Sequence, residues 1–438
     1  MPSPVNIFWF RRDLRLHDNA GLFHALKSGL PLIPIFIFDR NILDDLENKS
    51  DRRVSFIHSA VTDIENELKK LGSGLHVYYG YPGDVFRKLT GQYEIKAVYA
   101  NEDYESYAIN RDNSIQKYLN ALGIEFRSYK DQVIFSRDEI VKDDGKPYTV
   151  FTPYSRKWKS KLSDFYLSKY PTEKYFSAFA KITGSAILPL GEMGFKETAN
   201  KFPSKIIREN LIEGYHKNRD FPANEGTSHL GVHLRFGTIS IRELAARAKL
   251  LSEKFLDELI WRDFYQMILW NFPHIGQGKS FKSEYDFIEW KNNPKEFQKW
   301  CDGETGYPIV DAGMRELNAT GYMHNRVRMI VASFLIKHLL IDWRWGEAYF
   351  AKQLLDYEFA SNNGGWQWAA GSGCDAAPYF RIFNPYIQTK KFDPQFEYIR
   401  KWVNEFENPD YPKPIVEHEF ARKRALEVYG KALGKKFI

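Results

Sequence analysis

Residues 354–385 combine residue types that can hold a polar, aromatic molecule, in the order LLDYEFASNNGGWQWAAGSGCDAAPYFRIFNP. Carboxylates, amides and indoles alternate there with phenylalanines and alanines: Asp356, Glu358, Asn362, Trp366 and Trp368. Buried carboxylates and amides are costly unless a partner satisfies them. The Asn-Asn-Gly-Gly run at 362–365 lets a flat object approach the backbone closely. The composition leaves two alternatives, a dense internal hydrogen-bond network or a bound polar, aromatic ligand.

Two other groups have the spacing of one helix face. The first holds a carboxylate, an indole, a guanidinium and a phenol at i, i+3, i+4 and i+7: Glu258, Trp261, Arg262 and Tyr265. The second group is Asn325, Arg328 and Met329. The ordinary interpretation is a helix-surface ion pair with the tryptophan in the core and Met329 as core filler. The alternative interpretation is the lining of a site.

Three scattered sets also have both an ordinary and a functional interpretation. After Tyr215, the run Thr227, Ser228, His229, Leu230 and Gly231 is either a turn and helix start or a site for a diphosphate at a helix N-terminus. A lone tryptophan is normally core, and three of them are Trp290, Trp343 and Trp366. Scattered basic residues normally solvate a surface, and four of them are Arg219, Arg326, Arg381 and Lys391.

The N-terminal part of the chain alternates short apolar runs with helical patterns. Strand-like runs are expected at Val5–Arg11, Leu32–Phe38, Leu75–Tyr79, Ala97–Ala100 and Glu125–Ser128. Helices are expected between them, and this order predicts a doubly wound parallel sheet in an α/β domain over residues 1–130. No GxGxxG follows the first strand, so the dinucleotide fingerprint is missing. If the protein binds a main cofactor, it is therefore not expected in this domain.

The rest of the chain divides into a linker and a helical domain. Prolines and glycines break the pattern over 131–202, which is typical of an interdomain linker. Helical periods then fill 203–438, including one from Ser240 to Trp270, and predict an all-helical second domain. Ser240 with Glu243 three residues later forms a capping box. We expect a last helix at Ala421–Leu433.

Composition permits an anionic partner and gives no sign of a membrane or a metal. The net charge is +6, and the chain has 16% aromatic residues with 11 tryptophans, which suits either helical cores or stacking on planar ligands. Cys301 and Cys374 form no CxxC pair, so neither a disulfide framework nor a metal site is expected. No signal peptide or apolar run of about 20 residues is visible. We expect a soluble, cytoplasmic and monomeric protein.

Three long segments resemble the DNA photolyase/cryptochrome family, and most closely its class I-type cyclobutane pyrimidine dimer photolyases. They are the stretch 354–385, TGYPIVDAGMRELNATGYMHNRVRMIVASFLIKHLLIDWRWGE (Thr305–Glu347) and EGTSHLGVHLRFGTISIREL (Glu225–Leu244). FWFRRDLRLHDN (Phe8–Asn19) is similar to the opening of that family. The resemblance implies FAD, active as FADH⁻, in the helical domain. It also implies an antenna pigment in the α/β domain, either methenyltetrahydrofolate or a deazaflavin, with Asn101–Asp112 as a plausible contact.

The resemblance assigns roles to the candidate residues. The flavin contacts that it implies are Tyr215, Thr227, Ser228, His229, Leu230, Gly231, Glu258, Arg262, Asn325, Arg328, Asp356, Glu358 and Asn362. It pairs Arg328 with Asp356 beside the ring, and it places the Asn362 amide beside flavin N5. His229 stands where many relatives have arginine, and Glu358 where some have aspartate.

The resemblance also implies how a lesion is held and repaired. Glu258 would hydrogen-bond the damaged bases, and the residues that would contact lesion DNA are Arg219, Trp261, Arg326, Met329, Trp368, Arg381 and Lys391. Trp290, Trp343 and Trp366 would carry electrons from the surface to the flavin. Histidines replace Asn325 and Met329 in relatives that repair the (6-4) lesion, so this chain points to the cyclobutane lesion.

The resemblance predicts light-driven repair of cyclobutane pyrimidine dimers, in which excited FADH⁻ donates an electron to a flipped-out dimer. The competing hypothesis is a blue-light photoreceptor on the same fold, because a fold does not decide function. Asn362 favours repair, since signalling relatives have aspartate or cysteine at that place. A structural flavoprotein or nucleic-acid binder without photochemistry is a third hypothesis, which the three tryptophans disfavour.

Overall fold

The computed structural model describes residues 3–198 and 201–434 of the chain, which fall into two compact units. Unit 1 comprises residues 1–136, 162–207 and 229–249, and unit 2 comprises residues 137–161, 208–228 and 250–438. The two units are therefore interleaved in the sequence, with each contributing a segment between segments of the other. The domain boundaries 1–130, 131–202 and 203–438 stay a prediction, because compact units and functional domains need not share ends.

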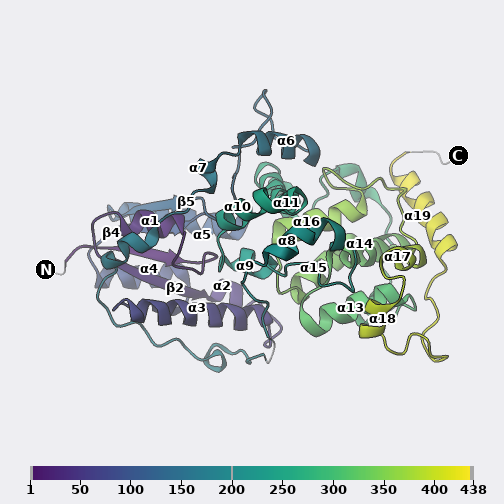
Figure 1. The fold of residues 1–438 in the computed structure, drawn as a ribbon, viewed down its shortest axis with the longest axis horizontal. Coiled ribbons are helices and arrows are strands. Elements are labelled where there is room, and N and C mark those ends of the chain that lie inside the picture. Colours follow the sequence, from purple (N-terminus) through teal and green to yellow (C-terminus); the bar gives the residue numbers. More distant parts are fainter. Residues whose placement is uncertain (1–2, 199–200, 435–438) are drawn as a thin grey trace. The chain divides into compact units, whose positions relative to one another are not determined.

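Unit 1 is built on a parallel sheet of five strands in the order β3-β2-β1-β4-β5 (Figure 1). The strands are β1 (Val5–Phe10), β2 (Leu32–Asp39), β3 (His76–Gly80), β4 (Ile95–Asn101) and β5 (Glu125–Tyr129). The helices of this unit are α1 (Ala20–Leu26), α2 (Arg40–Leu43), α3 (Arg52–Lys70), α4 (Pro82–Gln92), α5 (Ser106–Ala121), α7 (Asp164–Leu167), α9 (Gly231–Phe236) and α10 (Ile241–Leu251). Every residue of β1 and β2 is buried, as expected for strands covered on both faces. The predicted doubly wound parallel sheet is confirmed.

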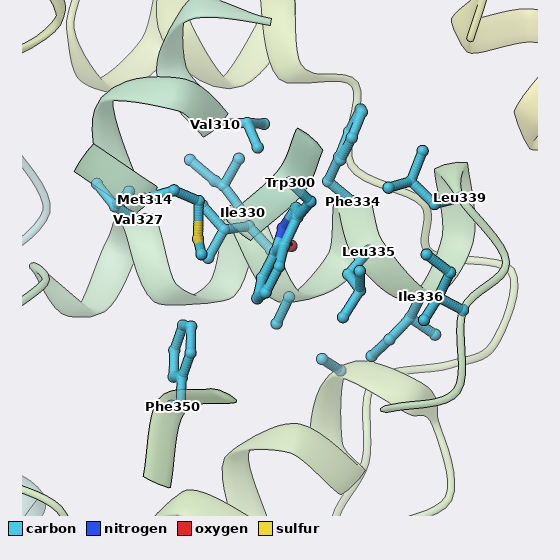
Figure 2. Close-up of a cluster of buried hydrophobic side chains, with 14 of the residues drawn as sticks. Trp300, Val310, Met314, Val327, Ile330, Phe334, Leu335, Ile336, Leu339 and Phe350 are labelled. Atoms are coloured by element: carbon cyan, nitrogen blue, oxygen red, sulfur yellow. The ribbon is translucent and has the colours of Figure 1, made fainter. Parts of the chain in front are cut away.

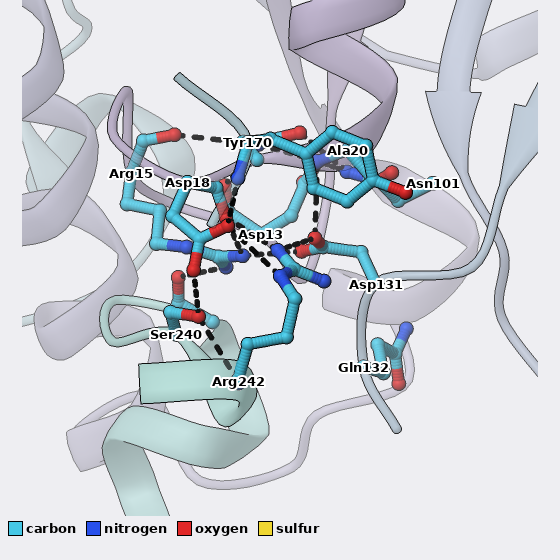
Figure 3. Close-up of polar contacts among 12 residues, drawn as sticks. Asp13, Arg15, Asp18, Ala20, Asn101, Asp131, Gln132, Tyr170, Ser240 and Arg242 are labelled. Carbon is cyan, nitrogen blue, oxygen red and sulfur yellow. Dashed lines mark hydrogen bonds and ion pairs between the residues drawn. The ribbon is translucent and has the colours of Figure 1, made fainter. Parts of the chain in front are cut away.

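A buried ionic network follows β1, in the segment whose sequence resembles the family opening (Figure 3). Arg15 donates to Asp131 at 2.6 Å, and Arg242 donates to both Asp131 at 2.7 Å and Asp18 at 2.8 Å. Burial opposes ionisation of Asp131, but the two guanidinium groups hold its pKa below the usual value. Truncating one member of a buried charge network costs about 3–5 kcal/mol, because the remaining charge is left without compensation. This part of the motif therefore serves the fold of unit 1.

Ser240 begins α10 as the capping box predicts. Its hydroxyl oxygen accepts hydrogen bonds from the backbone N–H of Arg242 at 3.1 Å and of Glu243 at 3.3 Å. The same hydroxyl donates to Asp18. The cap thus joins the helix start to the buried network as well as satisfying the free amides at the helix N-terminus.

His17 lies between two carboxylates on the surface of unit 1. Its Nε2 is 2.8 Å from Glu67 and its Nδ1 is 2.6 Å from Glu173. The hydrogen bond to Glu67, with a further contribution from the one to Glu173, raises the pKa of His17 to about 9 against an opposing effect of burial.

We expect His17→Gln to lower the free energy of unfolding at pH 6 and to have almost no effect at pH 10. Because the pKa of His17 is higher in the folded than in the unfolded protein, its protonation stabilises the fold. This stabilisation is fully present below the unfolded pKa of about 6.5, and it is lost as the pH rises to about 9 and beyond. The loss should stay within about 1 kcal/mol, because these side chains are largely exposed. Chemical denaturation at both pH values measures it, with the exposed His216→Gln as control. A pH-independent loss would contradict a charged His17.

Unit 2 is helical. Its helices are α6 (Phe151–Lys161), α8 (Glu209–Asn218), α11 (Glu253–Asn271), α12 (Pro294–Asp302), α13 (Pro308–Thr320), α14 (Asn325–Ser333), α15 (Trp343–Gln353), α16 (Phe359–Ala370), α17 (Pro385–Phe392), α18 (Glu397–Trp402) and α19 (His418–Ala432). A π-helical turn at Phe334–His338 extends α14. The predicted helical nature of this part of the chain and the predicted last helix are confirmed.

A cluster of buried side chains joins α12 to α16 of this unit (Figure 2). Trp300 is fully buried near its centre, and its indole N–H donates to the carbonyl of Val331 at 3.1 Å. Trp343 and Trp366 belong to the same cluster, each with 2% exposure. The cluster gives α15 and α16 a rigid support, so side chains on those helices are held in place.

Two segments differ from the expected pattern. The helical period from Ser240 to Trp270 is divided at Ser252, whose hydroxyl caps α11 by accepting from Phe255 N–H. The predicted linker contains α6, whose residues Tyr154 and Trp158 are fully buried. Trp158 donates to Asp263 of α11 at 2.9 Å. The apolar face of α6 thus packs on α11 in unit 2.

Among the described residues, none of the helices is both long and apolar enough to span a bilayer. The described part of the chain also contains no cluster of three or more His, Cys, Asp or Glu side chains that could hold a metal ion.

Candidate functional site

Asn362 lies inside α16, one turn after its start, and its side chain contacts α15. Its amide Nδ2 donates to the backbone carbonyl of Glu347 at 3.1 Å and to the carboxylate of Glu347 at 3.2 Å. Its Oδ1 accepts no hydrogen bond from any residue that the structure describes. Asn362 does not cap a turn, because the Asn-Asn-Gly-Gly run is helical. The amide is thus oriented with its NH₂ toward Glu347, and its oxygen is available to accept a hydrogen bond from a ligand.

Glu347 contacts the candidate residue Asn362, and sequence reasoning missed it. Burial raises the pKa of its carboxyl, and the hydrogen bond from Asn362 opposes that shift. Glu347 ends the WRWGE segment quoted for the family resemblance, but its spacing of 15 residues from Asn362 matches no helical or strand period. Only the packing of α15 on α16 brings the two side chains together.

Two ion pairs lie near the start of α16. Arg328 of α14 donates to both carboxylate oxygens of Asp356, at 3.1 and 3.0 Å, which confirms the predicted pair. Arg262 of α11 donates to Glu358 at 2.9 Å, and both of these side chains are buried. The ordinary interpretation of this helix face, an ion pair between Glu258 and Arg262, is wrong, because each pairs with a residue of another segment. Each pair ties α16 or the segment before it to another helix.

Glu258 pairs with Arg219, the residue that ends α8. Burial raises the pKa of Glu258, and the neighbouring Arg219 guanidinium opposes the shift. Arg219 was predicted to contact DNA phosphates, and here it holds the carboxylate proposed to contact the bases.

Trp261 stacks on Phe151, the first residue of α6, with ring centroids 3.7 Å apart and an interplanar angle of 2°. Phe151 was not among the candidate residues, because its segment was expected to be linker. An indole has two faces and Phe151 covers one of them. A base can therefore stack on Trp261 only through its other face.

The basic candidates fall into one group and one separate residue. Arg326 lies over the ring of Phe392 at 4.3 Å, and Lys391 lies over the same ring at 5.1 Å. Arg326 also donates to Asp220 at 2.6 Å. Arg381 is exposed in the loop before α17, next to the exposed Phe380.

The remaining candidates of α14 and α16 have different surroundings. Asn325 is the exposed first residue of α14, and Met329 accepts a hydrogen bond from Arg326 through its sulfur at 3.6 Å. Trp368 is half-buried and lines a small cavity with Tyr265 and Gln367. Trp366 and Trp368 thus differ in burial, as expected for side chains on different sides of α16.

The three tryptophans of the expected electron chain belong to one cluster in unit 2. Trp343 begins α15 and Trp366 is in α16, and both are buried, whereas Trp290 is half-buried and lies 6.0 Å from Tyr429. The ring of Trp366 covers Gly346, where a Cβ would come within 2.1 Å of it. Only Trp290 of the three is partly exposed, and the electron chain through them stays a prediction.

The predicted diphosphate segment is divided between the units. Thr227 and Ser228 belong to unit 2, and the hydroxyl of Thr227 is 3.0 Å from that of Tyr322. His229, Leu230 and Gly231 belong to unit 1, where His229 has a left-handed φ of 54° and Gly231 begins α9. Tyr215 lies in α8, where burial raises its pKa.

Two family models match the chain: "DNA photolyase" over residues 6–174 and "FAD binding domain of DNA photolyase" over residues 255–409. A deoxyribodipyrimidine photo-lyase of Halobacterium salinarum is 36% identical over 98% of this chain and 100% of its own length. The chain belongs to the DNA photolyase family. Among solved structures, a class III photolyase of Agrobacterium tumefaciens matches this photolyase-family chain with a TM-score of 0.87, 33% identity and 99% coverage of both chains. A cryptochrome of Synechocystis matches with a TM-score of 0.82 and 26% identity, over 98% of this chain and 99% of that one.

The residues of unit 2 fit the FAD that this domain binds. Asn362 presents an amide oxygen that suits an N–H of a flavin ring, and Arg328 offers positive charge from the adjacent helix. Gly365 lies one turn after Asn362 on the same side of α16. It is exposed, and a Cβ built on it would meet no atom within 4 Å. Open space beside an oriented amide and a cation is what a planar, partly anionic ring needs.

Gly364 and Gly365 provide a test of this fit. We expect Gly365→Ala to raise the stability of the flavin-free protein by about 0.5–1 kcal/mol, because alanine favours the helix, and to lower its affinity for FAD. Gly364→Ala should instead destabilise, since its Cβ would lie 2.3 Å from the Tyr265 ring. Thermal unfolding without FAD and fluorescence titration with FAD measure the two effects. Unchanged FAD affinity in Gly365→Ala would remove the flavin from this face of α16.

Proposed function

We propose that this photolyase repairs cyclobutane pyrimidine dimers in DNA, using light and bound reduced FAD. The observation that carries the proposal is the orientation of Asn362, whose NH₂ is held by Glu347 and whose oxygen is open. An oriented amide oxygen accepts from a protonated flavin nitrogen without adding charge to the site. Bound reduced FAD supplies the photoexcited electron.

The residues around the site hold the flavin and the lesion. Arg328, fixed by Asp356, supplies the cation that favours an anionic ring. Glu258, fixed by Arg219, hydrogen-bonds the damaged bases, and the uncovered face of Trp261 stacks on them. Desolvation strengthens each of these interactions, because water no longer screens them.

The basic residues bind the phosphates that flank the lesion. Arg326 and Lys391 share the Phe392 ring, which places two positive charges on one part of unit 2. Contacts to phosphates position a nucleic acid, while contacts in the cavity select the damaged base.

The competing function is a blue-light receptor, which the 26% identity to a cryptochrome keeps in view. One experiment separates the two. Reduced protein is illuminated with dimer-containing oligonucleotide, and restored thymines are measured by chromatography. Light-dependent recovery of thymines supports repair, and a stable photocycle without recovery supports the receptor.

We expect Glu258→Ala to lower the yield of repair per absorbed photon while FAD content stays at the wild-type level. The carboxyl is proposed to stabilise charge that develops on the dimer, an effect worth about 2.7–4 kcal/mol in dedicated oxyanion sites and less here. Glu258→Gln keeps a hydrogen-bonding group, so its repair yield should lie between those of wild type and Glu258→Ala. The exposed Glu253→Ala on the same helix is the control. An unchanged yield in Glu258→Ala would remove Glu258 from the chemistry.

A further inference from the structure

Asp220 lies between two of the predicted phosphate-binding arginines. It follows Arg219, which ends α8, and its side chain is 39% exposed. One carboxylate oxygen is 2.6 Å from Nη2 of Arg326 and 3.9 Å from Nε of Arg219. Arg219 in turn pairs with Glu258. Charges of alternating sign therefore run from α11 through the end of α8 to α14.

Among the described residues, Asp220 is the only strong hydrogen-bond acceptor of Arg326. Its Nη1 donates to the sulfur of Met329 at 3.6 Å, a weak acceptor, and its Nε is buried without a partner among the described residues. Its guanidinium lies over the ring of Phe392, which holds the plane but accepts no conventional hydrogen bond. A planar guanidinium with unused donors suits bidentate binding of a phosphate.

We infer that Asp220 competes with DNA phosphates for the guanidinium of Arg326. Asp220 occupies the one edge of Arg326 that has a strong acceptor, and it does so with the same charge as a phosphate. The exposure of Asp220 lets this pair open to an incoming anion. DNA binding then exchanges one ion pair for another, so the net gain from Arg326 is reduced.

This role rests on the proposed function, since it takes DNA as the anionic partner. In this role Asp220 lowers the affinity for DNA, whereas the basic residues raise it. Removing the Asp220 charge therefore strengthens DNA binding. If Asp220 served only to hold Arg326 in place, removing it would weaken DNA binding, so the two roles predict opposite signs.

The test is a double-mutant cycle measured in the dark with undamaged single-stranded oligothymidylate as the probe. We expect Asp220→Asn to tighten binding about two- to fivefold, the range of an exposed ion pair. The matched control is Glu427→Gln, which removes one exposed carboxylate from α19 and changes the net charge equally. The same pair of variants is then measured with Arg326→Ala in the background, where Asp220→Asn should tighten binding no more than Glu427→Gln does.

Salt dependence gives a second readout. Asp220→Asn should steepen the slope of log affinity against log salt by up to about one phosphate contact, and Glu427→Gln should leave it unchanged. Weaker binding in Asp220→Asn, or a gain that persists with Arg326→Ala, would overturn the competition.

Repair is assayed separately under light. Wild-type protein that binds the probe, shows the cycle and restores no thymines would overturn the repair function and leave the role of Asp220 standing. Intact repair without an effect of Asp220→Asn would overturn the role of Asp220 alone.

Discussion

Trp366→Phe should abolish light-driven reduction of the bound flavin and leave repair by chemically pre-reduced enzyme nearly intact. Trp366 is buried in unit 2 against Gly346 of α15, and Trp343 begins the same helix. An indole can lose an electron that a phenyl ring retains, so the substitution interrupts the chain at its inner end. Photoreduction is followed by absorbance under blue light with an external reductant, and repair is followed with dithionite-reduced protein.

Trp300→Phe is the matched control for this experiment. Trp300 is fully buried in the same cluster, and its ring lies 6.1 Å from that of Trp366. Both substitutions remove similar volume from one core, so their effects on packing should be alike. Equal loss of repair and photoreduction in Trp366→Phe would show that Trp366 is structural. Loss of photoreduction in Trp300→Phe as well would place Trp300 on the electron path.

Asn362→Asp should still bind FAD but should make its fully reduced state harder to reach. The introduced carboxylate adds negative charge beside the ring, which disfavours an anionic flavin. A unit charge at about 5 Å and an effective dielectric constant of about 20 is worth at most about 3 kcal/mol, or about 130 mV for a one-electron couple. Potentiometric titration measures the shift, and repair should fall with it.

The neighbouring Glu347 makes this effect depend on pH. Burial already raises the pKa of Glu347, and the aspartate variant removes the amide that donates to it. Two adjacent carboxyl groups share a proton at lower pH, so the potential should shift less at pH 6 than at pH 9. Asn363→Asp is the control, because Asn363 accepts from Gln367 on another side of α16. A potential that matches wild type at pH 9 would remove Asn362 from control of the flavin and weaken the case for repair.

The helices and strands could be predicted where the pattern of adjacent residues determines them. Strand runs such as Leu32–Phe38 and the capping residue Ser240 carry their signals in adjacent residues, and the structure confirms both. The break at Ser252 was missed because the apolar period continues across it on both sides. A capping serine inside such a period differs little in sequence from a serine on a helix surface.

The site was less predictable, because its partners come from segments far apart in sequence. The pairing of Arg328 with Asp356 followed from the family resemblance, and the structure confirms it. Helical spacing pointed to Glu258 with Arg262, yet each pairs with a residue of another element, Arg219 and Glu358. The positions of Phe151, Glu347 and Asp220 depend on tertiary packing, and no spacing rule connects any of them to its partner.

The interleaving of the two units has a consequence for synthesis on the ribosome. Trp158 of α6 meets its hydrogen-bond partner Asp263 across 105 residues, and residues 162–207 of unit 1 are made in between. At roughly 5–20 residues per second, the apolar face of α6 waits roughly 5–20 seconds for α11 to emerge. Arg242 likewise reaches Asp18 across 224 residues, so the buried network of unit 1 closes only after the whole unit 2 segment 208–228 has been translated. Neither unit can fold to completion from a continuous nascent segment, and chaperone protection of the emerging chain should matter more here than for proteins whose units follow one another in order.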